Sequence, residues 1–86
     1  MTTTSTMSRT ELVAALAEVL EEVAGTKPAA VTEQAAFYDD LDIDSLTMVE
    51  VVVACEERFD VRIPDEELEQ LKTVGDALDL ITRAGA

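Results

Sequence analysis

One stretch of the chain, residues 45–59, repeats its apolar side chains at the spacing of an α-helix. The repeat falls at positions i, i+3, i+4, i+7 and i+11, and its members are Met48, Val51, Val52, Cys55 and Phe59. Such a stripe lies on one side of a helix and packs against a core. Asp44 precedes the stretch and is a residue type that caps helix N-termini, so we expect a helix from Ser45 to Phe59.

The N-terminal part of the chain carries helix signals at both of its ends. Ser8 and Glu11 form a capping box, and the apolar repeat that follows stops at Gly25, which predicts a helix over about residues 9–24. Residues 1–7 are rich in Thr and Ser and show no apolar repeat. We therefore expect a disordered leader over residues 1–7 and one folded domain over residues 8–86.

The C-terminal part predicts two more helices. Pro64 and the acids after it are typical of the start of a short helix that reaches about Gln70. Thr73 and Asp76 form a capping-box-like pair before an apolar repeat that continues to about Arg83. The predicted fold class is all-α, with three main helices and one short helix.

A stretch of about 20 residues, from residue 25 to residue 44, shows no sustained helical repeat and is a long loop for a compact domain. We expect Val31, Phe37 and Leu41 to hold this loop on the core. Aromatic residues make up only 3% of the chain against 48% for all hydrophobic types, so the core has to consist mainly of Val, Leu, Ile and Ala.

The charge of the chain is strongly negative, with nineteen acidic and six basic residues and a net charge of −13. Thirteen acids and two arginines lie between Glu33 and Gln70, a net charge of −11. This charge repels nucleic acid and anionic membranes and attracts basic protein surfaces. No apolar run is long enough to span a membrane, and Cys55 is the only cysteine. We expect a cytoplasmic monomer without nucleic-acid or membrane partners.

The residue types present exclude several classes of active site. The chain has no histidine, so Ser-His-Asp and Cys-His catalysis are impossible, and no activity as an enzyme is expected. Asp40, Asp42 and Asp44 alternate like the first ligands of a calcium loop. Counted from Asp40, however, the sixth residue is Ser45 instead of Gly and the twelfth is Val51 instead of Glu, so no metal site is predicted. An acidic calcium- or protein-binding helical module without a prosthetic group is the alternative hypothesis.

The helix over residues 45–59 has more apolar width than a core requires. Three of its apolar residues fall outside the core stripe: Leu46, Val49 and Val53. They share a flank with Ser45 and Glu56, and Glu50 and Glu57 lie just beyond it. An apolar flank bordered by acids is typical of a surface that docks on other proteins. Ser45, at the helix start, lies beside free backbone N–H groups that can accommodate a phosphate ester.

Several segments resemble the motifs of one known family. The segment Asp39-Asp40-Leu41-Asp42-Ile43-Asp44-Ser45-Leu46 resembles the attachment motif of acyl carrier proteins, in kind those of bacterial type II fatty-acid synthesis. Further motifs follow in the expected order: Val49-Glu50-Val51-Val52, Ile63-Pro64-Asp65-Glu66 and Thr73-Val74-Gly75-Asp76-Ala77. The resemblance implies an acyl-carrier-like four-helix bundle. It also implies that a separate phosphopantetheinyl transferase attaches 4′-phosphopantetheine to Ser45, and that the thiol of this arm holds acyl groups as thioesters.

The resemblance implies a docking face as well. The partners would be the phosphopantetheinyl transferase, acyltransferase, ketosynthase and related enzymes, which would use basic patches and apolar contacts. The residues of the face would be Asp44, Leu46, Val49, Glu50, Val53 and Glu57. Asp42 stands where many members have Gly, and Thr47 where many have an acid. Fatty-acid and polyketide biosynthesis are therefore both open as the pathway.

Overall fold

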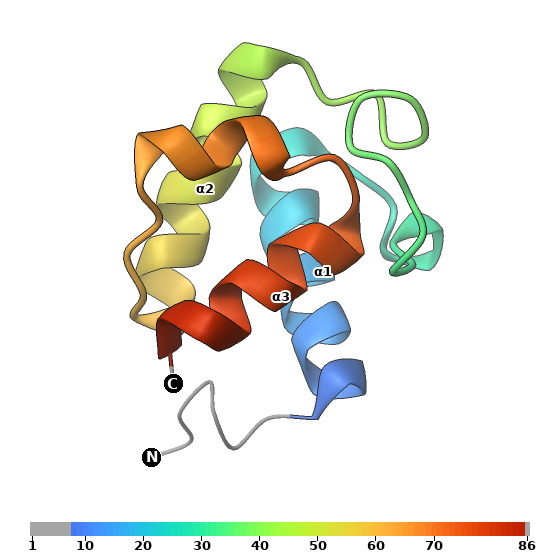
Figure 1. Cartoon of the computed structure of the whole chain (residues 1–86). Helices are drawn as coiled ribbons and strands as arrows, with labels where there is room; N and C mark the ends of the chain where they lie inside the picture. Colours follow the sequence, from blue (N-terminus) through green and yellow to red (C-terminus); the bar gives the residue numbers. More distant parts are fainter. Residues whose placement is uncertain (1–7, 86) are drawn as a thin grey trace.

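Three α-helices form the framework of the protein. The computed structural model describes residues 8–85, and the helices are α1 (Arg9–Ala24), α2 (Ser45–Phe59) and α3 (Val74–Gly85). Two 3-10 helices, η2 (Pro28–Ala30) and η3 (Asp65–Gln70), lie in the connections (Figure 1). Within residues 8–85 no strand is present, only an isolated antiparallel bridge between Ala36 and Thr73. The predicted all-α class with three main helices and one short one is confirmed; residues 1–7, the expected leader, lie outside the described residues.

The predicted caps set the ends of α1. The Ser8 hydroxyl accepts a hydrogen bond from the Glu11 backbone N–H, and the Glu11 carboxylate accepts one from the Ser8 N–H, both at 3.2 Å. Gly25 ends the helix in the left-handed conformation, with φ 71°. Glycine adopts this conformation without the Cβ penalty, which is why the helix stops where the sequence predicts.

The start of α3 has the same chemistry. The Asp76 backbone N–H donates to the Thr73 hydroxyl at 3.2 Å, and the Asp76 carboxylate accepts from the Thr73 N–H at 3.1 Å. The helix continues to Gly85, two residues beyond its predicted end. Helix ends fray and are the least predictable part of an element.

The long loop between α1 and α2 is held in place as predicted, with Val31, Phe37 and Leu41 all buried. Backbone hydrogen bonds fasten it to the start of α3: Phe37 N–H to the Lys72 carbonyl, and Val74 N–H to the Ala35 carbonyl. Gly75 donates to the Glu33 carbonyl at 2.8 Å, and a Cβ on Gly75 would lie 3.1 Å from the same oxygen. The close approach of loop and helix therefore favours glycine at this position.

The helices enclose one mainly aliphatic core, in which α1 packs against both α2 and α3 (Figure 1). Two sets of ion pairs bridge elements at the surface: Arg58 on α2 with Glu18 on α1, and Arg9 on α1 with Glu33 and Asp79. All five side chains are partly exposed, from 40% for Glu33 to 66% for Asp79. Pairs of this kind contribute about 0.2–1 kcal/mol each, so packing of the core is the main source of stability.

Candidate functional site

Ser45 is the first residue of α2 and is exposed. The segment before it is fixed, because Ile43 is buried and its N–H donates to the Phe37 carbonyl at 2.9 Å. Asp44 caps the helix: its carboxylate accepts a hydrogen bond from the Thr47 N–H at 2.8 Å. Within residues 8–85 the Ser45 hydroxyl makes no hydrogen bond, so a rigid frame presents an uncovered hydroxyl to an incoming reagent. This geometry fits a residue that is to be esterified.

The electrostatics at Ser45 combine two opposing contributions. The hydrogen bond from the Thr47 backbone N–H lowers the pKa of Asp44, so this carboxylate stays ionised beside Ser45. A phosphate ester would be repelled by it and attracted by the partial positive charge at the N-terminus of α2. Since Ser45 is exposed, water screens the repulsion, and the position can hold a phosphate group.

The three alternating aspartates before Ser45 are engaged separately. The Asp40 carboxylate accepts from the Ala36 N–H at 2.7 Å, and the Asp44 carboxylate caps α2. Asp42 has a left-handed backbone, with φ 54°. The part of the chain that the structure describes contains no group of three or more Asp, Glu, Cys or His side chains arranged to hold a metal ion. The left-handed conformation at Asp42 also explains why glycine suits this position in the family that the sequence resembles.

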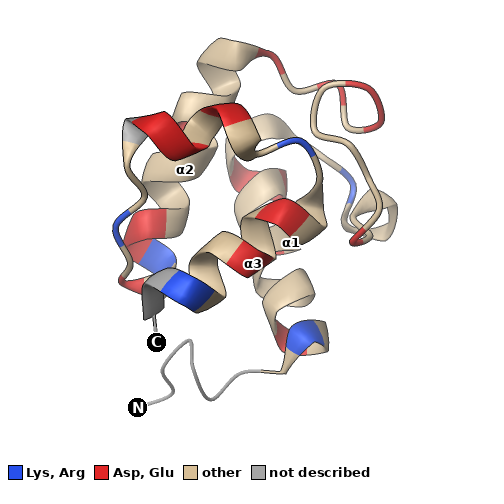
Figure 2. Cartoon of the chain, viewed as in Figure 1, with Lys and Arg blue, Asp and Glu red and all other residues tan. Residues whose placement is uncertain are grey.

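The outward face of α2 is apolar at its centre. Leu46, Val49 and Val53 are 74%, 49% and 48% exposed. Glu50 and Glu57 are exposed as well, so all six residues of the predicted docking face are exposed on α2 or at its cap. Acidic residues also lie along the loop before α2 and on η3 (Figure 2). The surface around Ser45 is thus an apolar strip with acidic borders.

Comparison with known proteins places this chain in a family. A family model described as "Phosphopantetheine attachment site" matches residues 14–81. The acyl carrier protein of Acidothermus cellulolyticus is 56% identical over 91% of this chain and 93% of its own length. The meromycolate extension acyl carrier protein of Mycolicibacterium aurum is 51% identical over 88% and 78%. A crystal structure of an acyl carrier protein from Thermotoga maritima superposes with a TM-score of 0.81 at 30% identity, covering 92% of each chain.

The chain belongs to the acyl carrier proteins. It is a carrier with a phosphopantetheine attachment domain, and the alternative of a module without a prosthetic group is not favoured. No helix within the described residues is long and apolar enough to cross a membrane.

The cysteine of the carrier lies in the core, as the apolar stripe predicts. Cys55 is buried, and this burial, with a smaller contribution from the charge of Glu56, raises the pKa of its thiol to about 12. A buried, protonated thiol is a poor nucleophile. The carrier's own sulfur is therefore unsuited to holding cargo.

Two residues near the site have surroundings that the sequence does not reveal. Glu56, placed on the docking flank from sequence, is half-buried, and its carboxylate accepts a hydrogen bond from the Ile63 N–H at 2.8 Å. It fastens the segment after α2 instead. Tyr38 is the second unforeseen residue, an aromatic side chain that is 48% exposed beside the buried Phe37. The sequence signal that could have pointed to Tyr38 is its position next to Phe37, because a loop that buries one of two adjacent side chains tends to expose the other.

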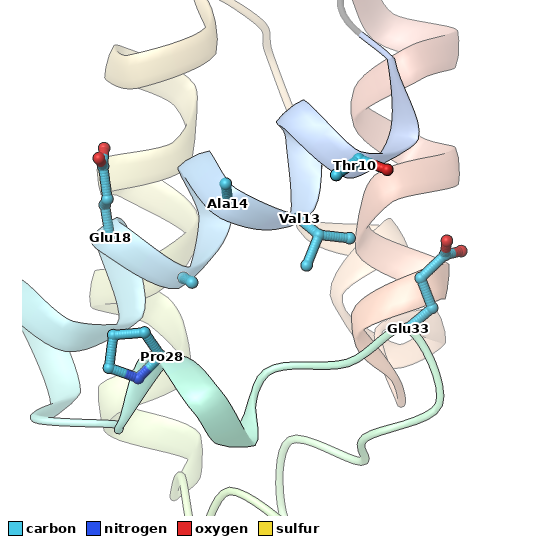
Figure 3. A pocket seen from close by; sticks show the side chains of 7 residues that line it. Thr10, Val13, Ala14, Glu18, Pro28 and Glu33 are labelled. Carbon is cyan, nitrogen blue, oxygen red and sulfur yellow. The ribbon is translucent and has the colours of Figure 1, made fainter.

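A separate groove of about 450 Å³ lies between α1 and the segment after it (Figure 3). Its lining residues are Thr10, Val13, Ala14, Ala17, Glu18, Pro28 and Glu33. None of them belongs to α2, and Pro28 and Glu33, the two that lie in the loop before it, are at least twelve residues away from Ser45 in the sequence. The groove is therefore not part of the Ser45 site.

Proposed function

We propose that Ser45 is the residue that carries phosphopantetheine and that the carrier presents acyl chains to enzymes of fatty-acid elongation. One observation carries the assignment. The sequence contains three serines, Ser5, Ser8 and Ser45, and only Ser45 lies within the residues that match the attachment-site family, 14–81. Its exposed hydroxyl at the start of α2 supports the same assignment.

The residues around Ser45 would position the hydroxyl and leave the chemistry to others. When bound, phosphopantetheine supplies a thiol on a flexible arm that carries the acyl group as a thioester. Asp44 fixes the first turn of α2, and Ile43 anchors the preceding segment, so Ser45 has a defined place on the surface. Transfer to and from the arm would be catalysed by partner enzymes, and the carrier itself would catalyse no reaction.

The exposed face of α2 supports a proposal about those partners. An apolar strip of Leu46, Val49 and Val53 bordered by Glu50 and Glu57 complements an enzyme surface with an apolar centre and a basic rim. Phosphopantetheinyl transferase, acyltransferase and ketosynthase are the partner classes we propose. The names of the relatives support fatty-acid or mycolate-type extension over polyketide synthesis. The single cysteine, buried and unpaired, fits a reducing cytoplasm.

Intact-mass measurement after incubation with coenzyme A and a promiscuous phosphopantetheinyl transferase tests the assignment. We expect the wild type to gain one phosphopantetheine and Ser45→Ala to gain none. Ser8→Ala is the matched control, because it also removes a serine hydroxyl at a helix N-terminus, and it should be modified like the wild type. Modification of Ser45→Ala, or an unmodified wild type, would refute the proposal.

The pathway is tested with the loaded carrier. A ketosynthase of fatty-acid elongation should accept it as a substrate at a higher kcat/KM than a ketosynthase of polyketide synthesis. The reverse preference would assign the carrier to polyketide synthesis.

A further inference from the structure

Tyr38 is an aromatic side chain that the fold leaves half exposed. Among the described residues, the large hydrophobic side chains that are exposed are Leu46, Val49 and Val53 on α2 and Tyr38 on the loop before it. At 48% exposure, about half of the Tyr38 surface is left uncovered and is available for contact with a partner. Tyrosine is among the residues most often responsible for binding energy in protein–protein interfaces.

The loop holds Tyr38 in a fixed place. The neighbouring Phe37 is fully buried, and the N–H groups of Asp40 and Leu41 both donate to the Ala36 carbonyl. The Asp40 carboxylate in turn accepts a hydrogen bond from the Ala36 N–H. Tyr38 therefore projects from a closed, hydrogen-bonded turn. A side chain held in this way loses less conformational entropy on binding than one on a free loop.

The same loop brings Tyr38 near Ser45. The Ile43 N–H donates to the Phe37 carbonyl at 2.9 Å, so the backbones at residues 37 and 43 are adjacent. Tyr38 is one residue beyond this contact and Ser45 two, which limits their Cα separation to about 18 Å. An average interface covers about 800 Å² per partner, a patch roughly 30 Å across. A protein that covers Ser45 can thus contact Tyr38 and the outer face of α2 at once.

The charge around Tyr38 defines the chemistry of that protein. Asp39 and Asp40 follow the ring directly, and the sequence has no Lys or Arg from Pro28 to Glu57. A backbone contact does bring Lys72 to this turn, since its carbonyl accepts a hydrogen bond from the Phe37 N–H at 3.0 Å, but the two aspartates outnumber this cation. A partner that fits this surface has an apolar pocket for the ring and lysines or arginines at its rim. The enzyme that modifies the Ser45 hydroxyl has to bring its active site to that atom, so it is the protein that must cover this region.

We propose that Tyr38 is a docking residue for the phosphopantetheinyl transferase, inserting its ring into an apolar pocket with a basic rim while Leu46 makes contact on the α2 side of Ser45. This inference rests on the proposed attachment at Ser45. It extends the docking surface from one helix to two elements that flank the modified residue.

Steady-state kinetics of phosphopantetheine transfer test the proposal on three variants. Tyr38→Ala should raise KM about three- to tenfold with kcat unchanged, since the ring contributes to binding and not to the chemistry. Tyr38→Phe keeps the ring and should behave like the wild type. Val13→Ala on α1, which also shortens a partly exposed apolar side chain, is the control and should leave KM unchanged.

The outcomes separate the two proposals. An unmodified wild type would refute attachment at Ser45. A wild type that is modified, together with Tyr38→Ala at an unchanged KM, would overturn only the role of Tyr38. An equal loss in Tyr38→Phe would assign the contact to the hydroxyl and overturn insertion of the ring.

A direct measurement uses the fact that Tyr38 is the only tyrosine. Carrier labelled with 3-fluorotyrosine gives a single fluorine resonance. Titration with the transferase in the absence of coenzyme A should shift this resonance, because the ring changes its surroundings, and bovine serum albumin at the same concentration should leave it unchanged. A resonance that does not respond to the transferase at concentrations above KM would overturn the proposal.

Discussion

The two faces of α2 use the same residue type for different purposes. Val51 and Val52 point inward and are 1% and 7% exposed, whereas Val49 and Val53 point outward and are 49% and 48% exposed. Hydrophobicity alone does not distinguish these four valines. Their angular position on the helix does, and it assigns one pair to the core and the other to the surface beside Ser45.

The difference separates stability from recognition within a single helix. Full burial of a valine side chain stabilises the folded state by about 1.5–3 kcal/mol. The inner pair contributes this on folding, whereas the outer pair, which the fold leaves about half exposed, keeps about half of it for contact with a partner. A substitution on one face should therefore change one property and leave the other nearly intact.

The largest expected effect concerns Cys55, on the inner face. With its pKa raised from 9.0 to about 12, the native thiol forms about a thousandfold less thiolate than an exposed one at the same pH. We expect a thiol reagent at pH 8 to label the native protein at least about a thousandfold more slowly than the protein in denaturant, as followed by absorbance. The rate in denaturant is the control. Fast native labelling would contradict burial of the inner face.

The next prediction compares the inner and outer faces of α2 by making the same change, valine to alanine, on each. Val51→Ala should lower the free energy of unfolding, measured in urea, by about 2 kcal/mol because it leaves a cavity in the core. Val53→Ala should lower it by less than about 0.5 kcal/mol. In the transfer assay the order reverses: Val53→Ala should raise KM, and folded Val51→Ala should not. Similar losses of stability in both variants would mean that the two faces are not distinct.

Local sequence signals were sufficient for most of the fold. Ser8 with Glu11 and Thr73 with Asp76 define helix starts within four residues, and the apolar stripe fixes the phase of α2. These contacts are short-range, so their chemistry can be read directly from the sequence. Ser45 could be singled out before its exposure was known, from its place at the start of the predicted helix and from the resemblance of the segment around it to a known attachment motif.

Features that depend on contacts distant in sequence could not be predicted. The bond between Glu56 and the Ile63 N–H requires the chain to turn after α2, and the exposure of Tyr38 depends on how the loop packs against α3. The Arg58–Glu18 pair joins residues 40 positions apart. Each depends on the tertiary arrangement, about which periodicity carries no information.

The smallest expected effect tests whether the acids of α2 act through their place or only through net charge. Glu50→Lys and Glu22→Lys make the same charge change at exposed positions, the first on the docking face and the second on α1. Glu18 is a poor control because its carboxylate pairs with Arg58 on α2 at 2.6 Å.

At low salt, Glu50→Lys should slow transfer to Ser45 about three- to tenfold, mainly through association, and Glu22→Lys by less than about twofold. The difference should fall toward zero near 1 M salt, where the Debye length is about 3 Å, whereas the defect of Val53→Ala should persist because apolar contact is not screened. Equal slowing by the two reversals would show that overall charge steers the partner, and α2 would then have no special part in recognition.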